Sequence, residues 1–300
     1  MASKRKMSLE RKKAWFGVLF ITPWLLGFIL LMAVPFIQSL QFSFHKLSLT
    51  SEGYDLQYVG LDNFKHILFV DAWYVRNLTE AVTTMALNVP LIIFFSLFTA
   101  TLLSQKFRGR MLARAIIFLP VVLASGVIAK LDNGNFLAQV MGTSSTDLES
   151  NYSGLRSLEL RPLLLQAGLS FDVVNYLTGA VDRIYQIISS SGVQILIFLA
   201  GLQSVSSSLY EAAKMEGATG YEAFWKITFP MISPLILTNV VYTIIDSFYN
   251  NRMTEMIQST AFGGLNFGVS AAMSWIYFLV ISIILVISTY FISKKVFYHD

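Results

Sequence analysis

Polar or ionisable side chains inside long apolar stretches are the residues of this sequence whose types could do chemistry. Because burying such a group costs free energy on the order of a few kcal/mol, it usually faces a cavity or another helix. In a cavity, amides and carboxylates can hydrogen-bond to the hydroxyl groups of sugars. The alternative is that each of them only holds two helices together. The candidates are Asn88, Gln194, Asn239, Tyr242, Asp246 and, near the end of its stretch, Asn250.

Asp246 is the strongest candidate for contact with a solute, because a carboxylate is harder to bury than an amide. It could equally be a structural partner of Tyr242 or Arg252. Asn88 is followed two residues later by Pro90, which removes a backbone hydrogen bond and bends a helix. Such a bend would either line a pathway or serve packing alone.

These residues do not form the constellation of an intramembrane enzyme. A protease would need a buried serine with a histidine, a pair of aspartates, or an H-E-x-x-H zinc site. The histidines, His45, His66 and His299, lie outside the apolar stretches, and Asp246 has no acidic partner within one. Cysteine is absent, which excludes disulfides and thiolate metal sites. We therefore expect no catalytic residue, no metal site and no cofactor in this chain.

The elements that must position the polar candidates are apolar stretches long enough to cross a membrane. The chain has 55% hydrophobic and only 13% charged residues, too little polar material to cover a soluble globule. Each stretch has about 20 residues, enough to cross the hydrocarbon core as a helix, and lacks the alternation of a barrel strand. We predict an all-α integral membrane protein with six transmembrane helices, at residues 15–38, 78–103, 112–129, 184–202, 231–249 and 267–292.

The basic residues predict the orientation of these spans, because Lys and Arg near span ends are retained in the cytoplasm. We expect a basic cytoplasmic tail at residues 1–14, followed by the six-span domain at residues 15–300, with both termini cytoplasmic. The net charge of +4 is explained by this topology, so we expect no binding to nucleic acid. The residues that set the orientation are Lys4, Arg5, Lys6, Arg11, Lys12, Lys13, Lys106, Arg108, Arg110, Arg114, Lys214, Lys226, Lys294 and Lys295.

The predicted outer loop at residues 131–182 is long for a connection and is therefore expected to have a function or to be mobile. Its Gly-Thr-Ser-Ser-Thr run at residues 142–146 is typical of a flexible loop. Residues 163–176 are apolar enough to lie along the membrane surface or to pack on a partner.

The predicted inner loop between the fourth and fifth spans carries two helix-start signals and one helix-stop signal. Ser208 and Glu211 have the spacing of a capping box, so a short helix is expected to begin there. Gly217 can take the left-handed conformation that ends a helix. Thr219 and Glu222 repeat the capping-box spacing, and we expect a second helix that continues into the next span.

The same inner loop, residues 204–230, resembles the EAA motif of ABC importer permeases, usually written EAA, three residues, G, nine residues, I-x-L-P. Phe229 replaces the Leu and keeps an apolar side chain. The segments Phe118-Leu119-Pro120 and Asp246-Ser247-Phe248, and the approach to the motif at residues 198–203, are similar to the carbohydrate branch of these permeases, which includes maltose and lactose-type systems. The residues that match the motif are Glu211, Ala212, Ala213, Gly217, Ile227 and Pro230.

The resemblance implies that this loop forms a coupling helix, which inserts into a groove on a cytoplasmic ATPase subunit. Glu211 would face basic groups of the ATPase, Ala212 and Ala213 would allow close approach, and Gly217 would supply the bend. The alternative is a well-capped amphipathic helix that lies on the membrane.

The resemblance also implies an assembly in the cell membrane. It would contain a second, related permease, two ATPase subunits and an extracytoplasmic solute-binding protein, and would import a sugar or oligosaccharide. ATP and Mg would be bound by the ATPase, because this chain has no G-x-x-x-x-G-K-[ST] phosphate loop. The alternative function is a secondary transporter driven by an ion gradient, but the sequence lacks the internal repeat that usually marks that class.

Overall fold

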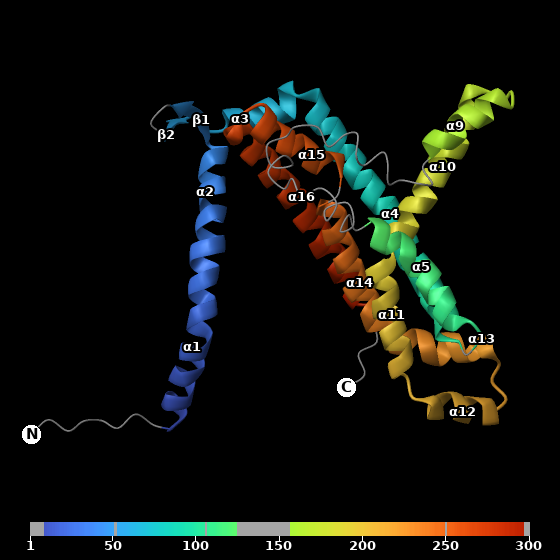
Figure 1. The fold of residues 1–300 in the computed structure, drawn as a ribbon. Helices are drawn as coiled ribbons and strands as arrows, with labels where there is room; N and C mark the ends of the chain where they lie inside the picture. Colours follow the sequence, from blue (N-terminus) through green and yellow to red (C-terminus); the bar gives the residue numbers. More distant parts are fainter. Residues whose placement is uncertain (1–8, 51–52, 106, 125–156, 250, 297–300) are drawn as a thin grey trace, which may run out of the picture. The chain divides into compact units, whose positions relative to one another are not determined.

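The computed structural model describes residues 9–50, 53–105, 107–124, 157–249 and 251–296 (Figure 1). Asn250 and the run at residues 142–146 lie outside these described residues. The chain divides into two compact units. Unit 1 comprises Met1–Val75 and Ile257–Tyr277, and unit 2 comprises Arg76–Met256 and Phe278–Asp300.

Unit 1 begins with a long apolar helix whose side chains are largely exposed. Helix α1 (Leu9–Phe28), a π-helical turn (Ile29–Ala33) and α2 (Val34–Ser43) follow one another without a break. The π-helical turn ends two residues before Pro35, which has no backbone N–H to donate, and such turns are a common cause of local helix distortion. In the stretch Trp15–Ser43 none of the most apolar window is buried against the described residues, so this helix is apolar and exposed over its length.

A β-hairpin follows α2. Strands β1 (His45–Thr50) and β2 (Gly53–Tyr58) are antiparallel, with His45 opposite Tyr58 and Thr50 opposite Gly53. The sequence analysis predicted only helices and missed this hairpin. The remaining elements of unit 1 are α3 (Asp62–Lys65), the π-helical turns His66–Val70 and Ser259–Gly263, and the first turns of α4 (Ala72–Ser104) and α16 (Phe267–Ser293).

The amide of Asn63 fixes the junction between α2 and the hairpin. Its Nδ2 donates to the carbonyl oxygens of Ser43 at 2.9 Å and of His45 at 3.0 Å. Gly268, at the start of α16, packs so closely that a Cβ there would overlap the carbonyl oxygen of His45. The junction therefore leaves no room for a side chain at position 268.

Unit 2 is built from helices. It contains the rest of α4, which together with α14 (Phe229–Tyr249) carries most of the polar candidates. Its other elements are α5 (Arg110–Ala124), α9 (Ser157–Gln166), α10 (Phe171–Ser190), α11 (Gly192–Ser204), α12 (Ser207–Met215), α13 (Gly220–Ala223), the π-helical turn Phe224–Thr228, the first part of α15 (Arg252–Gln258) and the part of α16 from Phe278 onward.

Four helices in the described part of the chain are long and apolar enough to cross a membrane, or up to five if a bent pair counts as one span. The four are Trp15–Ser43, Ala72–Ser104, Gly220–Tyr249 and Phe267–Ser293. Only the part of the predicted span 112–129 up to Ala124 is described, as α5. The number of six spans therefore stays a prediction.

The bent pair is α10 and α11, which meet at an angle of 50°. The sequence predicted one span over residues 184–202, and the structure interrupts it at Ser191. The hydroxyl of Ser191 donates to the carbonyl oxygen of Ile187, and Gly192 follows directly. Serine and glycine together are a recognised cause of sharp helix bends, since the hydroxyl competes for a backbone carbonyl and glycine does not resist the turn.

Helices α11 and α14 pack closely in unit 2. Gly201 lies against the side chain of Leu235, and a Cβ at position 201 would overlap it. Phe198 and Ile232 are among the buried side chains of this pair. The small residue lets the two backbones approach, which is the usual way helices associate within a membrane.

Candidate functional site

The first candidate site is the loop that carries the EAA spacing. Its first helix, α12, is capped by Ser206, whose Oγ accepts from the backbone N–H of Ser208 at 3.4 Å. The predicted capping box between Ser208 and Glu211 was wrong, because Ser208 already lies inside the first turn. Three serines stand in a row here, and Ser206 has the extended backbone that a capping residue requires.

Gly217 ends α12 in the left-handed conformation, as predicted, with φ of +83°. The N–H of Gly217 donates to the carbonyl of Lys214 at 3.1 Å, and the N–H of Ala218 donates to that of Ala213 at 2.9 Å. These two bonds form a Schellman motif. No atom lies within 4 Å of a Cβ built at position 217, so glycine is required by backbone conformation and not by lack of space.

The second predicted cap is confirmed. The backbone N–H of Thr219 donates to Oε2 of Glu222 at 2.9 Å, and the N–H of Glu222 donates to Oγ1 of Thr219 at 3.3 Å. This reciprocal pair begins α13, which continues through the π-helical turn into α14. The cap thus fixes where the helix of the next span starts.

The residues of the EAA spacing divide between two places in unit 2. Glu211 and Ala212 are exposed on α12, while Ile227 and Pro230 are half-buried around the start of α14. No side chain of α12 is buried, and Figure 1 shows this helix set apart from α11 and α13 by connecting segments. The exposed part of the motif is therefore free to contact another protein.

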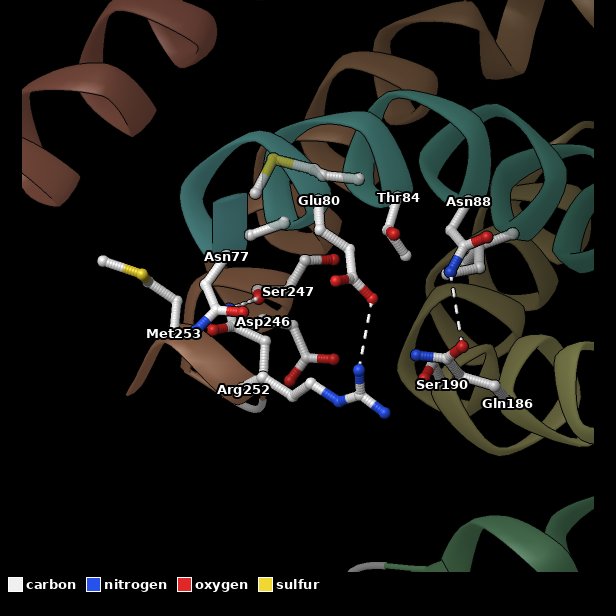
Figure 2. A pocket seen from close by; sticks show the side chains of 14 residues that line it. Asn77, Glu80, Thr84, Asn88, Gln186, Ser190, Asp246, Ser247, Arg252 and Met253 are labelled. Atoms are coloured by element: carbon white, nitrogen blue, oxygen red, sulfur yellow. Dashed lines mark hydrogen bonds and ion pairs between the residues drawn. The ribbon is translucent and has the colours of Figure 1, made fainter. Parts of the chain in front are cut away.

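The second candidate site is a pocket of about 330 Å³ in unit 2 (Figure 2). Helices α4, α10, α14 and α15 contribute its walls. The lining is dominated by amides, hydroxyls and charged groups, which can hydrogen-bond to a polar solute. The lining residues with polar side chains are Asn77, Glu80, Thr84, Asn88, Gln186, Ser190, Asp246, Ser247, Asn251 and Arg252.

Two of the predicted path residues, Asn88 and Asp246, line this pocket. Nδ2 of Asn88 donates to Oε1 of Gln186 at 3.4 Å, across from α4 to α10, as the dashed line in Figure 2 shows. Oδ1 of Asn88 is buried and has no hydrogen-bond partner within the described part of the chain. A buried acceptor without a partner costs free energy, so this oxygen is suited to a donor group from a solute or water.

The other predicted path residues do not line the pocket. Gln194 and Asn239 are buried, and Nε2 of Gln194 donates to Oγ1 of Thr243 at 2.9 Å between α11 and α14. That bond fits the interhelical alternative for Gln194. Asn239 is 0% exposed, and neither of its amide atoms has a partner among the described residues. Tyr242 is half-buried on α14.

The sequence analysis did not name Glu80 or Gln186, and it named Arg252 only as a possible structural partner of Asp246. Nη1 of Arg252 lies 3.4 Å from Oε1 of Glu80 at the pocket, as Figure 2 shows. One signal could have found the α4 part of the lining. Asn77, Glu80, Thr84 and Asn88 recur at intervals of three and four residues, which places them on one face of a helix.

Comparison with known proteins gives relatives along nearly the whole chain. The probable ABC transporter permease protein YesP of Bacillus subtilis (strain 168) is 27% identical over 95% of this chain and 93% of that protein. The arabinooligosaccharides transport system permease protein AraP of Halalkalibacterium halodurans is 30% identical over 78% of this chain and 68% of that protein.

The fold has a counterpart among solved structures. A chain in the crystal structure of a bacterial alginate ABC transporter, in complex with alginate pentasaccharide-bound periplasmic protein, superimposes with a TM-score of 0.67. The match covers 93% of this chain and 94% of that chain at 17% sequence identity. The chain thus has the type I ABC importer permease fold, as the resemblance of its EAA loop to ABC importer permeases implied.

The profile of one family, described as binding-protein-dependent transport system inner membrane component, matches residues 69–298, which include both the pocket and the loop with the EAA spacing. The chain therefore belongs to this family and is a multi-pass membrane permease subunit of an ABC importer.

Proposed function

We propose that this permease passes a sugar or oligosaccharide across the cell membrane, through a path that includes the pocket, and that α12 couples the path to ATP hydrolysis on a separate subunit. The observation that carries the proposal is the placement of the EAA residues. Glu211 and Ala212 are exposed on a helix without buried side chains, and the same motif ends at the start of α14, which reaches the pocket at Asp246.

Coupling at α12 is supported by its surface. Alanine side chains at positions 212 and 213 let a partner approach the helix backbone closely, and the carboxylate of Glu211 is available to a basic group. The Schellman turn at Gly217 and the cap at Thr219 fix both ends of the connection to α14. Ile227 and Pro230 then belong to the half-buried part of the motif, at the start of α14.

The choice of a sugar is supported by the pocket and by the names of relatives. Amides, hydroxyls and carboxylates are the groups that hydrogen-bond to the many hydroxyls of a carbohydrate. AraP is named for arabinooligosaccharides, and the solved transporter chain comes from a complex with an alginate pentasaccharide. In this proposal Asn88 and Asp246 contact the solute at the pocket, and a path role for Gln194, Asn239, Tyr242 and Asn250 stays a prediction from the sequence.

The assembly we propose has a second, related permease, two cytoplasmic ATPase subunits and an extracytoplasmic solute-binding protein. ATP and Mg bind to the ATPase, and this chain performs no catalysis. The basic tail at residues 1–14 and the C terminus lie in the cytoplasm, as does the loop at residues 204–230, while the loop at residues 131–182 lies outside. The exposed apolar helix Trp15–Ser43 supplies a face for lipid or for the second permease.

Cross-linking tests the coupling role. Met215 is 88% exposed on α12, so Met215→Cys in this cysteine-free chain should form a cross-link to a cysteine in the ATPase groove. Tyr290→Cys serves as the control, because Tyr290 is exposed on the apolar helix α16 and should face lipid. An assembled complex in which Met215→Cys gives no cross-link would remove α12 as the coupling element.

A further inference from the structure

One side-chain hydrogen bond ties α12 to the helix that leads into α14. The hydroxyl of Tyr210 lies 2.8 Å from Oγ1 of Thr228, and either oxygen can donate. The two residues are separated along the chain by the Gly217 turn and by α13. Thr228 is 5% exposed, and Tyr210 is half-buried, although its neighbours on α12 are largely exposed.

This bond matters because little else holds α12 in place. Among the described residues it is the one side-chain hydrogen bond from α12 to another helical element. The chain enters α12 through the extended backbone at Val205 and leaves it through the left-handed Gly217. Backbone connections at both ends allow α12 to swing, and a directional bond to a buried hydroxyl restricts that motion.

Thr228, the partner of Tyr210 in this bond, is part of a continuous helix. Thr228 closes the π-helical turn Phe224–Thr228, and Phe229 begins α14 with no intervening loop. The same α14 carries Asp246 and Ser247 into the pocket. Single π-helical turns are frequent at functional sites, where they place side chains that a regular helix would not.

We propose that the Tyr210–Thr228 bond is the contact through which a displacement of α12 moves α14, so that both residues are positioning residues for coupling. The proposal rests on the proposed function, in which α12 docks on the ATPase. Without the bond, α12 still docks, but its movement is absorbed at Val205 and Gly217 and no longer reaches the pocket.

The experiment follows a reporter in the pocket and needs no knowledge of the solute. Ser247→Cys is introduced into the otherwise cysteine-free permease of the assembled transporter, and its labelling rate with a water-soluble maleimide is measured with and without ATP and vanadate. In this background Tyr210→Phe and Thr228→Val should each reduce the nucleotide-dependent change in labelling rate about fivefold, the effect of one lost hydrogen bond on an equilibrium. The double variant should lose no more than either single one, because both remove the same bond.

Two controls separate the bond from general damage. Thr228→Ser keeps the hydroxyl and should behave as the unaltered chain does. Tyr221→Phe removes a hydroxyl from the same loop at a side chain that is 75% exposed, and should also change nothing. Labelling that responds to nucleotide as strongly in Tyr210→Phe and Thr228→Val as in these controls would overturn the proposal.

The cross-link from Met215→Cys to the ATPase is measured in the same complexes. We expect it to persist in Tyr210→Phe, since docking and transmission are separate steps. If the cross-link forms but Tyr210→Phe and Thr228→Val keep the full nucleotide-dependent change in labelling rate, only the role of the Tyr210–Thr228 bond fails. If no cross-link forms even with Tyr210 and Thr228 intact, the proposed docking of α12 fails, and the role of the bond fails with it.

Discussion

Arg252 and Glu80 form an ion pair at the pocket, with Nη1 3.4 Å from Oε1, and this pair joins α15 to α4. Its side chains are 79% and 51% exposed, so the pair contributes at most about 1 kcal/mol to stability. Asp246 lies in the same lining. The described lining thus holds the carboxylates of Glu80 and Asp246 and the guanidinium of Arg252. These charged groups can contact a solute, and their contribution to the stability of the fold is small.

Neutralising Glu80 should therefore separate function from stability. Glu80→Gln keeps the shape of the side chain and should leave the amount of inserted permease unchanged while it reduces solute uptake. Uptake into vesicles that contain the whole transporter, together with thermal unfolding of the purified complex, measures both quantities. The matched control is Glu255→Gln, an exposed carboxylate on α15 that is absent from the pocket lining. Equal uptake by both variants would remove Glu80 from the path.

Asp246→Ala is expected to reduce transport while assembly with the ATPase stays intact. The carboxylate lies at the pocket, and its contact with a hydroxylated solute would be worth roughly 1.5 to 3 kcal/mol, a tenfold or larger change in affinity. Uptake and co-purification of the ATPase provide the two readouts. Unchanged uptake would show that Asp246 has no role in the path, whereas failed assembly would favour a structural role.

Glu211→Lys and Gly217→Pro should abolish solute-stimulated ATP hydrolysis and uptake without loss of inserted protein. Lysine reverses the charge that a basic ATPase group would meet. Proline cannot adopt the φ of +83° found at Gly217, and the penalty is local because the turn is exposed. Glu211→Ala should cost well under about 1 kcal/mol of helix stability, because the side chain makes no capping box with Ser208. Normal uptake by both Glu211→Lys and Gly217→Pro would refute coupling through this loop.

Membrane orientation can be tested with single cysteines in this cysteine-free chain. A maleimide that cannot cross membranes should label Gly142→Cys in intact cells, and Thr219→Cys only after permeabilisation. The reason is that Lys and Arg are concentrated in the segments predicted to be cytoplasmic, and the loop that contains Thr219 is one of these segments. The reverse labelling pattern would overturn both the orientation and the coupling assignment.

Gly268→Ala should destabilise unit 1 by about 1 to 3 kcal/mol, the usual effect of overpacking, because its Cβ would overlap the carbonyl oxygen of His45. Gly179→Ala on α10 is the control, since no atom lies within 4 Å of a Cβ there. Thermal unfolding of the purified permease compares the two. A loss of stability no greater than that of the control would mean that the junction at Asn63 and His45 can relax.

The sequence by itself determined the features that depend on local chemistry. Long apolar stretches predict membrane helices because a helix satisfies its own backbone in lipid. The stop at Gly217 and the cap at Thr219 were predictable because each depends on residues within a few positions of one another. The EAA spacing pointed to the family for the same reason, as it lies within one short loop. The cap at Ser206 was missed because three adjacent serines compete, and only the backbone conformation selects one of them.

Tertiary structure decided what joins distant segments. Asn88 and Gln186 meet across the pocket, and so do Glu80 and Arg252, although neither pair is close in sequence. The sequence could mark Asp246 and Asn239 alike as polar groups in an apolar span, but packing put Asp246 at the pocket and buried Asn239 away from it. The physical reason is that burial cost depends on residue type, which a sequence shows, whereas the partner that offsets the cost depends on how the helices pack.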